Sequence, residues 1–150
     1  MRAVIQRVSR AKVEVNGQTE GAIQQGLLVF LGVEDADSTK DIEWLVRKII
    51  HMRIFSDEAG KMNLSVKDIS GQLLVISQFT LHASTKKGNR PSFIKAAPPK
   101  KAEALYEQVI ASCSEALGKS IESGVFGAHM DVQLINDGPV TIIIDTKQKE

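Results

Sequence analysis

The sequence predicts an α+β fold: a curved, mostly antiparallel sheet or open barrel with two main helices packed against it. Three observations lead to this prediction. Segments typical of strands dominate both ends of the chain, two amphipathic helical patterns lie between them, and no strand–helix–strand unit is repeated. With 150 residues, 43% of them hydrophobic and 25% charged, residues 1–150 are expected to form one domain with a substantial core.

The first third of the chain is expected to form antiparallel strands. Residues 3–8 and 12–15 are rich in β-branched side chains, and Asn16-Gly17 is a two-residue hairpin signal because both residue types tolerate positive φ. Residues 26–33 form a continuous apolar run bounded by glycines. This run predicts a central strand covered on both faces.

Two helices are expected next. Ser38, with Asp41 three residues later, resembles a capping box, and an apolar stripe with helical spacing follows it. The second helix begins near the paired prolines 98–99 and ends at Gly118. The two stripes consist of Ile42, Leu45, Val46, Ile49 and Ile50, and of Ala102, Leu105, Tyr106, Val109, Ile110, Cys113 and Leu117.

The remaining strands flank the second helix. Residues 73–76 predict a second buried strand, and residues 130–135 and 140–145 predict two more strands. Between this last pair lies Asn136-Asp137-Gly138-Pro139. These four residues fit a plain hairpin turn, but proline removes one N–H donor from the ladder, and an X-Pro bond can also adopt the cis form.

Composition excludes several classes of protein. A net charge of +1 is not that of a strong polyanion binder, so any nucleic-acid contact must be local. Cys113 is the only cysteine, which excludes an intramolecular disulfide and fits a reducing compartment. The chain starts without the apolar segment of a signal peptide, and no apolar run approaches the roughly 20 residues of a membrane span. We therefore expect a cytoplasmic protein without a membrane partner.

Metal and nucleotide motifs are missing from the sequence. His51, His82 and His129 are widely scattered, and none has a second ligand at a spacing typical of metal sites. The chain also has neither of the common glycine-rich phosphate loops. We expect no metal and no cofactor.

The apolar strand at residues 73–76 changes abruptly into the polar segment Ser77-Gln78-Phe79-Thr80. If the strand continues, Thr80 and His82 share a face, which would place a hydroxyl nucleophile near a base. The alternatives are a strand that frays into a loop and a histidine that lies at the surface. No orienting carboxylate is evident in the sequence.

The segment Lys86-Lys87-Gly88-Asn89-Arg90-Pro91-Ser92-Phe93 predicts a mobile basic loop. Its cations suit phosphates, and Phe93 offers a ring on which a nucleobase can stack. A solvated surface loop explains the same composition equally well.

Several segments together resemble a known family. They are MRAVIQRV at the start, RIFSDEAGKMNLS at residues 53–65, SQFTL at 77–81, KKGNRPSF at 86–93 and NDGPVT at 136–141. In this order and without a large insertion, they resemble the D-aminoacyl-tRNA deacylases. The resemblance covers residues 1 to about 145.

The resemblance implies hydrolysis of the ester between a D-amino acid, or glycine, and the terminal adenosine of tRNA, with L-aminoacyl-tRNA rejected. It also implies a homodimer whose active sites lie at the interface and need no metal. Thr80 would match a residue once favoured as the nucleophile, while Ser77, Gln78 and Phe79 would frame the pocket. The remaining matches are Gly138 and Pro139, which would form a Gly-cisPro motif that reaches into the partner's pocket, and the tRNA-binding candidates Lys86, Lys87, Arg90 and Phe93.

Because Thr80 lacks an evident base, we expect the 2′-hydroxyl of the terminal ribose or an oriented water to act as the nucleophile. Two other hypotheses stay open at this point. One is a hydrolase of a different ester or amide that uses Thr80 with His82. The other is a dimeric RNA-binding module without catalysis.

Overall fold

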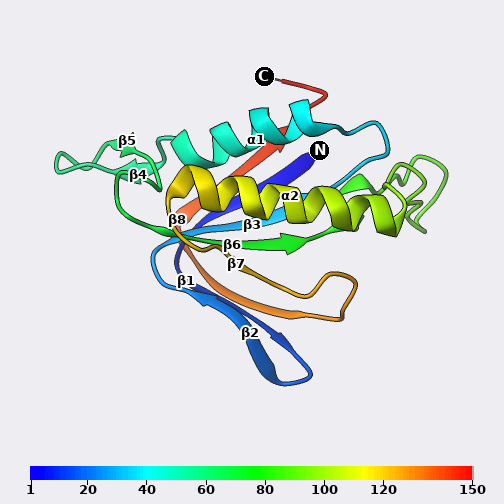
Figure 1. Ribbon diagram of the computed structural model, residues 1–150, viewed down its shortest axis with the longest axis horizontal. Helices are drawn as coiled ribbons and strands as arrows, with labels where there is room; N and C mark the ends of the chain where they lie inside the picture. Colours follow the sequence, from blue (N-terminus) through cyan, green and yellow to red (C-terminus); the bar gives the residue numbers. More distant parts are fainter. Residues whose placement is uncertain (150) are drawn as a thin grey trace.

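The computed structural model describes residues 1–149 and confirms the predicted fold class (Figure 1). One sheet has the strand order β2-β1-β3-β6-β7, with β8 paired to the other side of β1, and β4 and β5 form a small separate hairpin. The elements are β1 Arg2–Val15, β2 Gln18–Ile23, β3 Gly26–Gly32, α1 Thr39–His51, β4 Phe55–Ser56, β5 Met62–Leu64, β6 Gln72–Ser77, the 3₁₀ helix η1 Phe79–His82, α2 Pro99–Leu117, β7 Glu122–Ser123 and β8 Asp131–Asp145.

Two long strands replace the four short ones expected at the ends of the chain. Residues 3–8 and 12–15 belong to the single strand β1, which turns at Asn16-Gly17 into β2 as predicted. Residues 130–135 and 140–145 fall almost entirely within the single strand β8, because both halves pair with β1. The hairpin interpretation of residues 136–139 is therefore wrong.

The two helices agree closely with the prediction and lie on one side of the sheet (Figure 1). Their apolar stripes pack with β3, β6 and the start of β1 into one core, in which Cys113 is fully buried. Burial raises the pKa of the Cys113 thiol to about 12, so it stays protonated. Gly118 ends α2 in the left-handed conformation at φ 78°, as expected of a C-terminal glycine.

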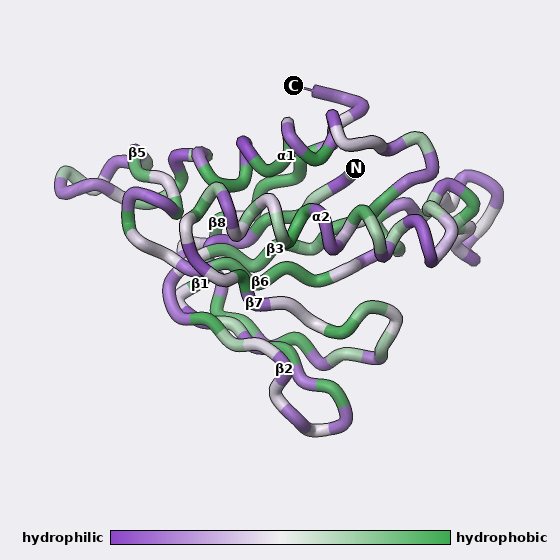
Figure 2. The backbone as a smooth tube through the Cα atoms, viewed as in Figure 1, coloured by the Kyte–Doolittle hydropathy of each residue, from purple (hydrophilic) through white to green (hydrophobic). Residues whose placement is uncertain are grey.

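Side chains that point away from the helices form a second, smaller core. Figure 2 shows that the central strands are predominantly hydrophobic. In β3, for example, Leu27 and Val29 contact the helices, whereas Leu28 packs into the second core beneath the β1–β2 hairpin. The prediction of a central strand buried on both faces is confirmed.

Three neighbouring strands share one direction, which the expected antiparallel pattern did not include. β3 pairs parallel with β6, and β6 pairs parallel with β7. Their carboxyl ends therefore meet at one edge of the sheet, the position at which parallel sheets commonly bind ligands. In Figure 1 this edge is the one to which the β6 arrow points.

Asp41 joins the start of α1 to the end of the chain. Its carboxylate accepts hydrogen bonds from the Ser38 N–H at 2.9 Å, the Thr146 hydroxyl at 2.7 Å and the Lys147 ammonium at 2.9 Å. Burial alone would raise the pKa of Asp41, but the hydrogen bonds from Thr146, Lys147 and Ser38 outweigh it and lower the pKa well below 3.8.

We expect Asp41→Asn to destabilise the fold at neutral pH and to matter less in acid. A carboxyl with a lowered folded pKa stabilises the protein fully above its unfolded pKa, near 3.8. This contribution declines as the pH falls below 3.8 and is lost as the pH passes through the lower folded pKa, so at pH 3 it is reduced. Loss of the charge-assisted bonds should lower the free energy of unfolding by about 1.5–3 kcal/mol at pH 7. Urea titrations at pH 7 and pH 3 measure the difference, and an equal deficit at both pH values would contradict the account.

Candidate active site

A pocket of about 690 Å³ opens at the carboxyl end of β6, beside the segment that follows β7. Ser77 and Gln78 line one wall at the end of β6, and the prolines that begin α2 line another. The segment between β7 and β8 closes the third side with Phe126. The pocket thus gathers three of the four residues of the predicted active-site segment.

Phe79 and Phe93 bring the polar segment and the basic loop together. Their rings meet edge to face, with centroids 5.1 Å apart and planes at 76°. Both line the pocket, and Phe79 is 59% exposed. An exposed ring at the mouth of a pocket offers a flat surface on which a nucleobase can stack.

The chain turns into the 3₁₀ helix η1 directly after Gln78, so the strand does not continue past Phe79 and the condition for a shared face of Thr80 and His82 is not met. The Gln78 N–H donates to the carbonyl of Leu31 at 2.7 Å and ties the turn to β3. The Gln78 amide donates to the Thr80 hydroxyl at 2.5 Å. Thr80 is exposed beside the pocket and is not part of its lining.

His82 is buried, and the prediction of a surface histidine is wrong. It is 3% exposed, its Nε2 has no hydrogen-bond partner, and its ring lies against Gly32 at the end of β3. No hydrogen bond joins Thr80 to His82 among those of residues 1–149. The structure therefore gives the hypothesis of a Thr80–His82 pair no support.

Arg2 fixes the far end of η1. Its guanidinium donates to the carbonyl of Leu81 at 2.6 Å and to the carboxylate of Asp145 at 2.9 and 3.1 Å. The start of β1, the end of β8 and the turn at η1 are thereby held together. The sequence analysis did not identify this arginine.

The basic loop is exposed, as predicted. Lys86, Lys87 and Arg90 are exposed and surround a second hollow of about 470 Å³, which adjoins the first because Ile94 lines both. The structure brings Phe93 into the candidate pocket and places the three cations beside it.

Gly138 and Pro139 lie elsewhere, in a bulge of β8. Gln6 and Val8 of β1 pair with Thr141 and Asn136, so four residues of β8 stand opposite Arg7 alone. The peptide bond between Gly138 and Pro139 is cis, as the resemblance implied. Both residues are exposed and neither lines the pocket of the same chain among the residues described.

Arg7 holds this bulge in place. Its Nε donates to the carbonyl of Asp137 at 3.0 Å, and its Nη1 donates to the carbonyl of Ile54 at 2.6 Å. On the other side, the Asn136 side chain accepts from the N–H of Val140 at 2.9 Å. The bulge is therefore braced at both ends by side chains.

The sequence analysis missed Arg7, although a signal exists. Side chains alternate along a strand, so Arg7 shares the inward face of β1 with Ala3 and Ile5. A charged residue on an apolar face requires buried partners. This requirement could have identified Arg7 as a structural or functional residue.

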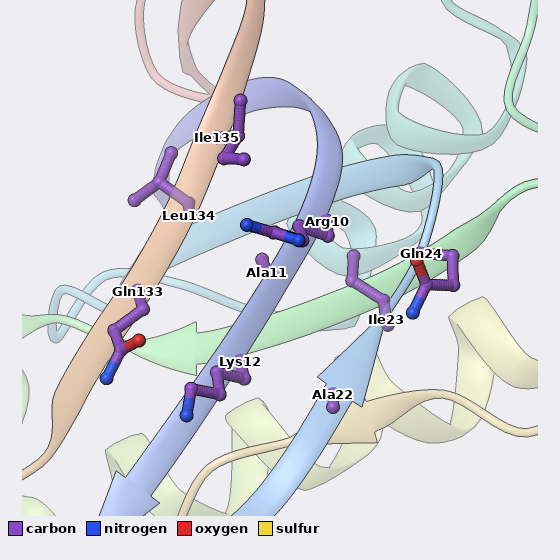
Figure 3. A pocket seen from close by; sticks show the side chains of 9 residues that line it. All are labelled: Arg10, Ala11, Lys12, Ala22, Ile23, Gln24, Gln133, Leu134 and Ile135. Carbon is purple, nitrogen blue, oxygen red and sulfur yellow. The ribbon is translucent and has the colours of Figure 1, made fainter.

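A further hollow of about 560 Å³ lies between β1, β2 and β8 (Figure 3). The residues that line it include Arg10, Ala11, Ile23 and Gln24. None of the predicted site residues belongs to it, and the residues described contain no cluster of histidine, cysteine and carboxylate side chains that could hold a metal. No helix within residues 1–149 has the length and apolar character needed to span a membrane.

Comparison with known proteins decides the family. Residues 4–145 match the family model described as D-Tyr-tRNA(Tyr) deacylase. The chain belongs to this deacylase family. Proteins named D-aminoacyl-tRNA deacylase from Flavobacterium johnsoniae and Bacteroides fragilis are each 59% identical to it over 150 residues, which is 100% of both chains.

Two solved structures have the same fold as this deacylase-family chain. The c-Myc DNA Unwinding Element Binding Protein superimposes with a TM-score of 0.92 at 43% identity, over 97% of this chain and 98% of that one. A probable eukaryotic D-amino acid tRNA deacylase superimposes with a TM-score of 0.84 at 17% identity, over 95% and 97%. The second likeness concerns the fold alone.

Proposed function

We propose that the chain, as one domain over residues 1–150, hydrolyses the ester bond of D-aminoacyl-tRNA and releases the free D-amino acid. The observation that carries this proposal is the pocket at the carboxyl end of β6. It unites Ser77, Gln78, Phe79 and Phe93 in a chain that belongs to the deacylase family. A tRNA substrate also supports the cytoplasm as the place of action.

In the proposed function, the Phe79 ring binds the nucleobase and backbone N–H groups of η1 bind the ester. The adenine of the terminal nucleotide stacks on Phe79, which places the ester beside η1. The first N–H groups of a 3₁₀ helix have no partner within the helix, so those of Phe79 and Thr80 can donate to the ester carbonyl. Charge that develops on this oxygen is stabilised by such fixed donors.

Discrimination between enantiomers requires a rigid wall. D and L amino acids carry the same groups, so a pocket that binds only through apolar contact cannot distinguish them. Even one additional methylene changes the binding free energy by just about 1–3 kcal/mol. We propose that the carbonyls of Gly138 and Pro139 bind the α-ammonium at one fixed angle. An L side chain then collides with backbone, a D side chain points to solvent, and glycine is accepted.

We propose that the wall comes from a second copy of the chain in a homodimer. Gly138 and Pro139 are exposed, and the described part of their own chain places neither in the pocket. Ile143 is 70% exposed and pairs in register with Val4, which in turn pairs with Phe30. These residues form an apolar strip on the face that the helices leave uncovered, which supports an interface there.

Thr80→Ala is expected to keep most of its kcat. The Thr80 hydroxyl accepts a hydrogen bond from the Gln78 amide and has no base as a hydrogen-bond partner in the described part of the chain. This fits a residue that positions Gln78 while the 2′-hydroxyl of the ribose or a water attacks. Single-turnover hydrolysis of D-Tyr-tRNA measures the effect. A loss of about 10⁴ or more, the size found when a triad member is removed, would instead make Thr80 the nucleophile.

The test of the proposed function compares D-Tyr-tRNA, L-Tyr-tRNA and Gly-tRNA as substrates of the purified protein. We expect release of D-tyrosine and glycine, with L-Tyr-tRNA spared. Tight binding of all three tRNAs without hydrolysis would favour an RNA-binding module. Equal hydrolysis of the D and L forms would refute the chiral role.

A further inference from the structure

The hollow inside the basic loop is surrounded by positive charge. Lys86, Lys87, Arg90 and Lys95 line it, and no carboxylate of residues 1–149 does. None of the ion pairs within residues 1–149 includes any of these four cations. Four cations that gather without an acidic partner repel one another, so an anion between them is favourable.

The loop is closed at its base, which keeps the cations around the hollow. Ser84 and Ser92 exchange two backbone hydrogen bonds of 2.8 and 2.9 Å. Both serines line the hollow and add hydroxyl donors to it. Oxygen-rich anions such as phosphate accept hydrogen bonds from this combination of guanidinium, ammonium and hydroxyl groups.

Ile94 connects this hollow to the active-site pocket. It lines both spaces and is 91% exposed, so the two open onto the same surface. The pocket that holds Phe79 and Phe93 takes the nucleoside in the proposed function. A group attached to that nucleoside on the side of Ile94 would reach the cations directly.

We infer that the hollow binds the phosphate on the 5′ side of the terminal adenosine, with Arg90 and Lys95 among the cations that hold it. The inference rests on the proposed function, because that function places the adenosine on Phe79. The 3′ oxygen carries the ester toward η1, and the 5′ phosphate leaves on the other side of the ribose. The site thereby fixes the terminal nucleotide at both ends.

Three small probes test this inference by direct calorimetric titration: adenosine, 5′-AMP and 3′-AMP. The variants are the double variant Arg90→Ala/Lys95→Ala and, as a control, Lys61→Ala, which removes an exposed cation from the remote turn between β4 and β5. Thermal unfolding of each variant checks that it folds. 3′-AMP carries the same charge as 5′-AMP, but its phosphate is on the 3′ oxygen, which carries the ester in the proposed substrate.

We expect wild-type protein and Lys61→Ala to bind 5′-AMP at least about tenfold more tightly than adenosine, the effect of one charge-assisted hydrogen bond. 3′-AMP should show no such gain, and the double variant should bind 5′-AMP and adenosine alike. The inference is overturned if 5′-AMP has no advantage in the wild type, if 3′-AMP gains equally, if the double variant keeps the preference, or if no probe binds. Hydrolysis of D-Tyr-tRNA is a separate measurement, and its absence would refute the proposed function instead.

Discussion

Replacing Gly138 with alanine is expected to lower kcat/KM for D-Tyr-tRNA by about 100-fold or more, because small displacements of a positioning group are that costly. Gly138 has a φ of +137°, which L side chains rarely adopt. A Cβ there would lie 2.8 Å from the Val140 side chain, 2.9 Å from its backbone nitrogen and 3.2 Å from the Arg7 guanidinium. The bulge must move to accept it.

Gly60→Ala is the matched control for this prediction. Gly60 also has a positive φ, +75°, but a Cβ there meets nothing within 4 Å. Both variants should lose about 1–3 kcal/mol of stability through backbone strain. Only Gly138→Ala should lose activity, and a Gly138→Ala protein with wild-type kcat/KM and unchanged discrimination would refute the role of the bulge.

Arg7→Ala is expected to reduce both stability and activity. Arg7 is 8% exposed and its guanidinium donates to two backbone carbonyls, those of Asp137 and Ile54. Removing a charged donor from two acceptors should cost about 3 kcal/mol in the free energy of unfolding. The released bulge should also lower kcat/KM for D-Tyr-tRNA and relax the rejection of L-Tyr-tRNA.

Arg7→Lys separates charge from geometry. Lysine keeps the positive charge but lacks the planar fork that reaches both carbonyls at once, so this variant should also lose activity. Arg53→Ala serves as a surface control, since Arg53 is exposed and donates to the Asn63 carbonyl at 2.9 Å. It should change stability by no more than about 0.5 kcal/mol. An Arg7→Lys protein equal to the wild type would contradict this account.

The sequence predicted best what local periodicity determines. The stripe from Ile42 to Ile50 has helical spacing, and α1 buries that stripe. Asn16 and Gly17 form the predicted turn because both adopt positive φ. Each of these features depends on neighbours within a few residues of the chain.

Long-range pairing limited the prediction elsewhere. Asn136 to Pro139 carry the residues of a hairpin turn, yet both flanking segments pair with β1, which no local pattern reveals. The burial of His82 involves Gly32, 50 positions earlier in the sequence, because a Cβ at position 32 would lie only 3.0 Å from the ring. The strand-to-turn change at Gln78 likewise depends on the carbonyl of Leu31.

The candidate site was predicted only in part, again because some of its contacts join residues that lie far apart in the sequence. Ser77 to Phe79 and Phe93 were selected from motifs, and the structure gathers them in one pocket. Arg2 and Arg7 were missed because their carbonyl acceptors lie far away in the sequence. The composite site that we propose between two copies would not be encoded in any local pattern.

Complementation between two defective variants tests most directly whether the pocket of one subunit works with the bulge of another. One variant carries Gln78→Ala/Phe79→Ala and lacks the pocket, and the other carries Gly138→Ala and lacks the bulge. Co-expressed, they should recover about a quarter of wild-type D-Tyr-tRNA hydrolysis, since half of randomly paired dimers are mixed and each mixed dimer has one intact site of two. Activity no higher than the mean of the two variants alone would contradict the shared site.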